Sequence, residues 1–290
     1  MSVDNSTLVE TYRSVVAPGE CDIMGHLTMA CYFDRFTDAA FALIDRIAPA
    51  AAPPAAAWRT TTILTRYQQE LRAGDALFVR SGVIGEGEDG IRIGHELVNA
   101  GTGEVATLVE HTLAPRDLPY GALAEQRRVL ARAATVWHSP GFEDEKRIAR
   151  AERMIETGRD RVKAWEVDER GELSQSGLMH RCAFACMHLF TALGATPAVL
   201  LQERRGFSTF ETRLHLDAPL PGAGDGIAVR TGLLATGNSS LRMLHELRQA
   251  RGGEPIARCY QSGVHFDLEA RRSVAMPAAW RDRAKALLVI

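Results

Sequence analysis

A long amphipathic pattern lies in the first half of the chain, between about His26 and Ala48. Its apolar side chains recur at spacings of three and four residues, at Met29, Phe33, Phe36, Ala40, Leu43 and Ile44. Such spacing places them on one face of an α-helix, which predicts a single long helix with a buried face. A leading strand and a tight glycine-containing stretch are expected before it.

Four strand-like segments follow this helix. The stretches between them, Ala-Gly-Asp, Gly-Glu-Asp-Gly and Gly-Thr-Gly, are typical of tight turns. Because the connections are so short, we expect consecutive antiparallel strands around one helix. The predicted strands are residues 60–71, 76–85, 91–99 and 104–113.

The same arrangement is predicted a second time, because the sequence repeats at an offset of 150 residues. Between 74–104 and 224–254, 13 of 31 positions are identical, where average composition would give about two. The chain is therefore interpreted as a tandem duplication. The second copy is predicted to contain a strand at 162–167, a helix at 179–193 and strands at 207–216, 227–234, 241–249 and 255–266.

The predicted fold class is α+β, with a first unit at 1–117 and a second at 161–290. The connecting segment 118–160 is rich in Glu, Arg and Ala, which predicts one or two solvated surface helices. A sheet curved around one helix leaves one sheet edge unprotected. We therefore expect the two units to pair as an intramolecular pseudo-dimer, with ligand clefts between the halves.

Residues shared by both copies are expected to serve the fold, and residues that differ are candidates for a site. His95 and His245 occupy matching places on the apolar face of a strand, which predicts a hydrogen-bonded core histidine in each copy.

The copies differ just before the helix. With Gly25 aligned to Gly177, Ser174 stands in the place of Asp22, and a leucine stands in the place of His26. This alignment predicts one working site per chain and a second that is degenerate or structural.

Asp22 has two interpretations. Asp is favoured just before a helix, where its carboxylate offsets unsatisfied amide groups. The segment Asp22-x-x-Gly25-His26 also places a carboxylate and an imidazole beside the positive end of a helix dipole, where N–H groups can hold a developing oxyanion. The second arrangement is typical of acyl transfer.

These residues resemble the 4-hydroxybenzoyl-CoA thioesterase family of hotdog-fold acyl-CoA thioesterases. The resemblance rests on three stretches: Asp22-x-x-Gly25-His26 with Tyr32 on the helix, Gly19-Glu20-Cys21-Asp22, and Tyr67-x-x-Glu70-Leu71-Arg72-x-Gly74-Asp75. It implies two tandem hotdog units, each an antiparallel sheet wrapped around a long central helix.

The resemblance also implies a set of site residues. Asp22 would be the catalytic carboxylate, His26 its polar partner and the backbone N–H of Met29 an oxyanion donor. Relatives often have Asn-Asn where this chain has Thr28-Met29. The residues implied to contact substrate in this unit are Gly25, Thr28 and Tyr32.

The opposite wall of the cleft is expected to come from the second copy. Its polar candidates are His180, Arg181 and Arg213. On a helix, His180, Cys182 and Cys186 do not converge, so neither a metal nor any other cofactor is implied.

The implied activity is hydrolysis of an acyl-CoA or related acyl thioester, with Asp22 either attacking the carbonyl or activating a water. Two alternatives stay open. One is a non-catalytic acyl-CoA-binding or scaffolding protein. The other is a hotdog enoyl-thioester hydratase, although that family's Asp-x-Asn-Pro-x-His pattern fits poorly here.

Composition narrows the partners. With 34 basic and 36 acidic residues and a pI near 6.5, the chain lacks the basic excess of nucleic-acid binders. It has no apolar run of membrane-spanning length and no secretory signal, so we expect a cytoplasmic protein. Its five cysteines form no CxxC pair and are expected to be free thiols. Association of pseudo-dimers into a homo-oligomer stays open.

Overall fold

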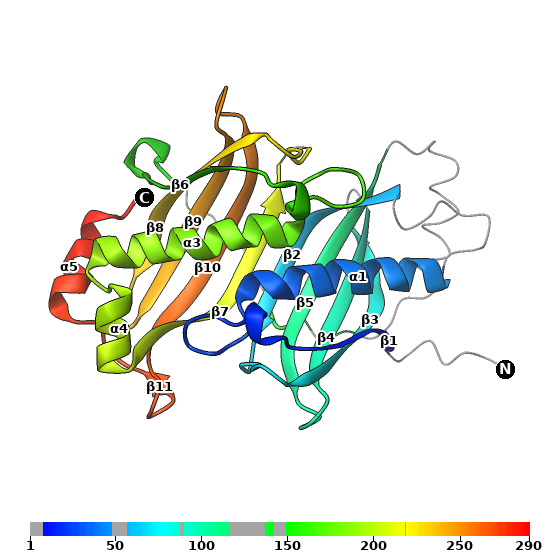
Figure 1. Ribbon diagram of the computed structural model, residues 1–290, viewed down its shortest axis with the longest axis horizontal. Coiled ribbons are helices and arrows are strands. Elements are labelled where there is room, and N and C mark those ends of the chain that lie inside the picture. Colours follow the sequence, from blue (N-terminus) through cyan, green and yellow to red (C-terminus); the bar gives the residue numbers. More distant parts are fainter. Residues whose placement is uncertain are drawn as a thin grey trace. The chain divides into compact units, whose positions relative to one another are not determined.

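The protein divides into two compact units, Met1–Phe142 and Glu143–Ile290. Figure 1 shows the computed structural model, which describes residues 8–47, 57–87, 90–116, 137, 139–141, 149–217 and 219–290. Each unit contains one long helix that runs across one face of an antiparallel sheet (Figure 1).

The first unit builds its sheet in the order β1-β3-β4-β5-β2, and every neighbouring pair is antiparallel. The short 3-10 helix η1 and the long helix α1 connect the edge strand β1 to β2. The elements are β1 (Val9–Val15), η1 (Pro18–Glu20), α1 (Met29–Ile47), β2 (Trp58–Tyr67), β3 (Ala76–Gly87), β4 (Gly90–Asn99) and β5 (Val105–Pro115).

The second unit repeats this order as β6-β8-β9-β10-β7, with the short strand β11 paired to β10. Its elements are η3 (Ala151–Arg153), β6 (Ile155–Arg161), η4 (Ala164–Glu166), α3 (Gln175–Leu193), α4 (Pro197–Glu203), β7 (Arg205–Leu216), β8 (Gly226–Thr236), β9 (Ser240–Gln249), β10 (Pro255–Asp267), β11 (Arg272–Ser273) and α5 (Ala278–Ala286).

The structure confirms the predicted fold class of two tandem units, each with a sheet around one long helix. The strand predicted at 162–167 is wrong, because the chain forms η4 there and the leading strand is β6. β6 therefore begins inside the range expected to be a linker. The helices predicted within 118–160 fall largely on residues outside the described set, and the pairing of the two units stays a prediction.

The missed strand has a simple cause. The long helices correspond at an offset of 146 residues, since Met29–Ile47 matches Gln175–Leu193, whereas the strands after them match at 150. Four additional residues therefore lie between the long helix and β8 of the second unit, in the stretch that contains α4. The alignment of Gly25 with Gly177 corresponds to an offset of 152, so it places the leading strand and the residues before the helix six positions too late.

The core of each unit lies between its long helix and its sheet. In the first unit, Leu43 and Ile44 of α1 pack with Trp58 of β2 and with aliphatic residues of β3, β4 and β5. In the second unit, α3 begins after Ser174, whose hydroxyl accepts the Gly177 N–H, and it ends at Gly194 with φ +93°. These caps fix both ends of the helix.

The core histidines are confirmed. His95 and His245 are fully buried, and the Nδ1 atom of each lies within 2.8 Å of a hydroxyl, that of Ser81 or Thr231. Burial lowers the pKa of His245 to about 4, despite an opposing hydrogen bond with Gln261. His245 is therefore neutral in the folded protein at physiological pH.

This burial makes stability dependent on pH. An unfolded histidine has its ordinary pKa near 6.5, so the unfolded state binds more protons as the pH falls below that value. Stability is expected to decrease from about pH 6.5 toward pH 4, by up to about 1.4 kcal/mol per pH unit for one residue. In urea unfolding, the variant His245→Gln should show a shallower decrease over this range than the wild type. An equally steep decrease would contradict the assignment.

Candidate active site

The loop before α1, residues Pro18–Thr28, forms a turn that is held by the exposed side chain of Asp22. Its Oδ1 atom accepts the backbone N–H groups of Met24 at 2.8 Å and His26 at 3.1 Å. Gly25 completes the turn with φ +78°, a conformation that strongly favours glycine. The helix begins only at Met29, so Asp22 caps this turn rather than the helix itself.

The same turn occurs in the second unit. Oδ1 of Asp168 accepts the N–H groups of Arg170 at 2.9 Å and Glu172 at 3.0 Å, and Gly171 has φ +77°. Asp168 therefore corresponds to Asp22. This corrects the sequence alignment, in which the acid was absent from the second copy.

The remaining pairs follow from the same geometry. Glu172 takes the place of His26, and Ser174 takes the place of Thr28 instead of Asp22. The acid is thus common to both units, and the imidazole is not.

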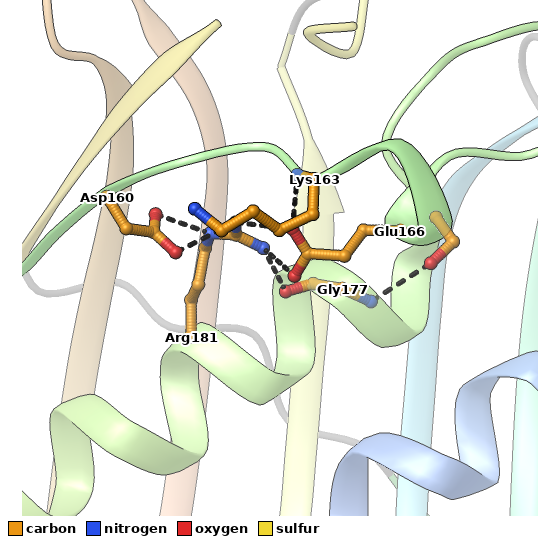
Figure 2. A network of polar contacts seen from close by, with 6 residues as sticks. Asp160, Lys163, Glu166, Gly177 and Arg181 are labelled. Atoms are coloured by element: carbon orange, nitrogen blue, oxygen red, sulfur yellow. Dashed lines mark hydrogen bonds and ion pairs between the residues drawn. The ribbon is translucent and has the colours of Figure 1, made fainter. Parts of the chain in front are cut away.

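A buried arginine fixes each loop to its helix. In the first unit, Arg35 of α1 donates to both carboxylate oxygens of Glu20 at 2.9 Å. In the second, Arg181 of α3 lies between Asp160 and Glu166, and Figure 2 shows it bridging the two. Arg181 also donates to the Gly177 carbonyl at 2.8 Å.

These contacts decide the role of Arg181. Its side chain is only 4% exposed, and its guanidinium is engaged by two carboxylates and a carbonyl. Partial burial opposes ionisation of Glu166, yet its hydrogen bonds from Arg181 and from the Lys163 N–H outweigh this and lower its pKa. The pair is therefore a charged clamp, and Arg181 is not a free cation for substrate.

In the first unit, a cluster of polar side chains forms beside the Asp22 turn. Backbone bridging pairs His26 with Arg72, in the loop after β2. The Nε2 atom of His26 then lies 3.2 Å from Oε2 of Glu70 and 3.3 Å from an Arg72 guanidinium nitrogen. Glu70 and Arg72 belong to the stretch from Tyr67 to Asp75 that resembles the thioesterase family, but the sequence analysis gave neither residue a role.

The two contacts at Nε2 belong to different protonation states. A protonated Nε2 donates to the Glu70 carboxylate, whereas an unprotonated Nε2 accepts from Arg72. The cluster thus provides a hydrogen-bond partner for Nε2 of His26 in either form.

The second unit has no counterpart of this cluster. There the bridge joins Glu172 to Gly222, so neither an imidazole nor a guanidinium stands at these positions, and Leu220 replaces Glu70. The imidazole, its carboxylate and its guanidinium are all specific to the first unit.

The other predicted residues have mixed placements. Met29 is the first residue of α1, where helix N–H groups lack intrahelical acceptors, and Thr28 precedes it, both half-buried. Tyr32 is only 3% exposed and packs edge-on against Tyr67 at 5.2 Å. Burial raises the pKa of the Tyr32 hydroxyl. Tyr32 is a core residue of this structure.

The remaining candidates of the second unit do not gather near the loop before α3. His180 lies on α3 with its ring 6.1 Å from that of Phe184. Arg213 is paired with Glu211 on β7 at 3.1 Å, both nearly buried. Its neighbour Thr212 lies opposite Gln261, which contacts α3, so Arg213 projects from the sheet face away from that helix.

Several further features bear on the site. All five cysteines are free thiols. Among the described residues, no group of three or more His, Cys, Asp or Glu side chains is placed to hold a metal ion. In the same part of the chain no single helix has the length and apolar character to span a membrane, and α3 and α4 meet that test only as a pair bent by 79°.

Comparison with known proteins places the chain in a family. Residues 16–134 and 162–284 each match the thioesterase-like superfamily, and the chain belongs to it as a tandem pair of units. No curated protein sequence matches significantly.

Solved structures of similar fold cover nearly the whole chain. An acyl-ACP thioesterase from Bacteroides thetaiotaomicron has a TM-score of 0.62 at 15% identity, covering 88% of this chain and 96% of its own. The 12:0-ACP thioesterase from Umbellularia californica has a TM-score of 0.62 at 11% identity, covering 88% and 93%. These likenesses confirm the double hotdog fold.

The buried clamp yields a stability prediction. Replacing Arg181 by Met leaves two carboxylates without their cation, so Arg181→Met should lower the free energy of unfolding by about 3 kcal/mol. Asp160 is 44% exposed, and Asp160→Asn, the control, should cost less than about 1 kcal/mol. Urea unfolding measures both. Equal effects of the two substitutions would show that the clamp does not stabilise the unit.

Proposed function

We propose that the first unit hydrolyses the thioester bond of an acyl-CoA or a related acyl carrier, releasing a free acid and a thiol. Membership in the thioesterase-like superfamily supports thioester hydrolysis in general. The observation that carries the assignment to the first unit is the cluster of His26, Glu70 and Arg72 beside the Asp22 turn, because the second unit keeps the turn without the cluster.

The reaction makes modest demands on the protein. A thiol leaving group has a pKa near 8.5, so the carbonyl needs polarisation more than the leaving group needs protonation. The N–H of Met29, at the positive end of α1, is suited to stabilise the tetrahedral oxyanion. One such donor typically contributes about 3 kcal/mol.

Asp22 supplies the carboxylate. Oδ1 is held by two amide groups, and among the described residues no hydrogen bond engages Oδ2. In one route, Oδ2 attacks the carbonyl carbon, the C–S bond breaks, and water then hydrolyses the mixed anhydride. In the other, Oδ2 takes a proton from the attacking water. In both, His26 protonates the departing thiolate, and Glu70 orients the imidazole.

The two routes differ in where oxygen from water appears. A single turnover in heavy-oxygen water labels the Asp22 carboxylate only in the nucleophilic route, because hydrolysis of the anhydride can return one labelled atom to the enzyme. A label in the peptide containing Asp22, detected by mass spectrometry, therefore identifies the nucleophilic route.

A second candidate function is non-catalytic binding of an acyl thioester. The observation that favours it is the identical turn around Asp168, since a carboxylate present in both units can be purely structural. Thiol release from short, long, branched, aromatic and charged acyl groups, each offered on CoA and on acyl-carrier protein, separates hydrolysis from binding. Loss of enoyl absorbance without thiol release would indicate a hydratase.

The duplicated turn supplies a matched control for Asp22. An Asn side chain can still accept both amide bonds through its carbonyl oxygen, so Asp22→Asn and Asp168→Asn should fold equally well. Asp22→Asn should lower kcat at least about 100-fold, since it removes the nucleophile or base, whereas Asp168→Asn should stay within about twofold of the wild type. Similar activity in both variants would assign Asp22 to structure alone.

Glu70 and His26 should act as one unit. Glu70→Gln keeps the size of the side chain but removes the carboxylate that orients the imidazole, so kcat should fall about 10-fold or more. His26→Gln should lower kcat further, and the double variant should be no slower than His26→Gln, because Glu70 acts through the imidazole. Steady-state kinetics on one acyl-CoA measures the cycle. Independent, multiplying effects would separate Glu70 from His26.

A further inference from the structure

The two units differ in one row of side chains that crosses three strands. In the first unit, Arg13 of β1 lies opposite Phe78 of β3, which lies opposite Val98 of β4. Residues opposite each other on neighbouring strands share one face of the sheet. The guanidinium of Arg13 lies over the Phe78 ring, 5.3 Å from its centroid. The aromatic ring of Phe78 therefore fills the centre of this row.

The matching row of the second unit is open. Arg159 of β6 lies opposite Ala228 of β8, which lies opposite Arg248 of β9. An alanine thus replaces the phenylalanine, and a second arginine replaces the valine. The small side chain at the centre leaves a space between two guanidinium groups that has no room to form in the first unit.

This space is part of a hollow of about 510 Å³ on the surface of the second unit. A volume of this order is typical of small-molecule sites. Three arginines, Arg159, Arg230 and Arg248, and one glutamate, Glu156, give the hollow a cationic lining.

The charges of the hollow are unbalanced in the second unit only. In the first unit, Arg80 pairs with Glu96 at 2.5 Å. The corresponding Glu246 accepts instead from Arg248, at 3.2 Å. The guanidinium of Arg230 donates to the carbonyl of Met154 at 3.4 Å, and its charge acts on Glu156, which lies opposite it on β6 but is hydrogen-bonded to Arg159.

Two carboxylates therefore face three guanidiniums. Arg159 is held by Glu156 through two hydrogen bonds, and Glu246 is held by Arg248. Arg248 adds a cation to this row of the second unit, and no carboxylate is added with it. Because Arg248 takes the hydrogen bonds of Glu246, Arg230 can receive an anion from solution.

We propose that this hollow binds the phosphate groups of a nucleotide-type anion. Guanidinium groups match phosphate oxygens with paired N–H donors, and several of them converging on one site favour phosphate over a single carboxylate. The volume accommodates more than an inorganic ion. Two sources share this chemistry: the nucleotide end of a CoA thioester, which rests on the proposed function, and a separate nucleotide, which does not.

The test replaces residues of this row by those that occupy the matching positions in the first unit. Isothermal titration calorimetry of the full chain with adenosine 3′,5′-bisphosphate should show binding by the wild type. Ala228→Phe and Arg248→Val should each weaken it at least about 10-fold, because one fills the hollow and the other removes a guanidinium. Both substitutions reproduce a row that the same fold already contains, and circular dichroism checks that the variants are folded.

Two controls complete the binding experiment. Arg13→Gln removes the matching guanidinium from the first unit and should leave the affinity unchanged. Adenosine, which lacks phosphate, should not compete. Absence of binding by the wild type, or equal affinity in Ala228→Phe, overturns the proposal.

Kinetics then identify the source of the nucleotide. If the hollow receives the substrate, Ala228→Phe raises KM for an acyl-CoA and leaves KM for the matching acyl-pantetheine, which has no nucleotide, unchanged. If it receives a separate nucleotide, bisphosphate binding is lost in Ala228→Phe with both KM values unchanged. Asp22→Asn should bind the bisphosphate like the wild type, so a failure of the proposed hydrolysis and a failure of this site give different results.

Discussion

A buried arginine at the second turn of each long helix is the contact on which the site depends. A guanidinium removed from water must be paired, and Arg35 and Arg181 are paired with Glu20 and Glu166 of the loop before their own helix. The loop is thereby held against the first turns of the helix. The loop that carries the aspartate turn is therefore fixed at the start of the helix, where N–H groups lack intrahelical acceptors.

The duplication separates the framework from what was added to it. Both units keep the clamp, the aspartate turn, and a core hydrogen bond between a hydroxyl and a strand histidine, Ser81 with His95 and Thr231 with His245. The features that differ lie where side chains leave this framework: a polar cluster at the loop of the first unit and an arginine-lined hollow on the sheet of the second. One scaffold thus carries two distinct surfaces, as expected where function resides in sites and not in the fold.

The sequence predicted most of the fold and less of the site. Apolar spacing located α1 and the strands, because a buried face imposes its period on every residue of an element. The register before α3 was wrong, because Gly25 was aligned with Gly177, which lies inside α3, whereas the glycine of the matching turn is Gly171. Glu70 and Arg72 were not assigned roles, because a backbone bridge between His26 and Arg72, 46 residues apart, is what brings their side chains to the imidazole. The sequence pattern does not predict this bridge.

The repeated aspartate shows why retention of a residue does not define its role. The two amide groups that hold Oδ1 of Asp22 also fix the direction of Oδ2, and the same bonds hold Asp168 in the second unit. The carboxylate and its turn are thus common to both units, whereas the residue that follows the turn glycine is His26 in one and Glu172 in the other. In the proposed mechanism the imidazole of His26 carries the proton, and an acid at that position has no ring nitrogen to do so. The proposed difference between the units therefore arises from the neighbour of the aspartate and not from the aspartate itself.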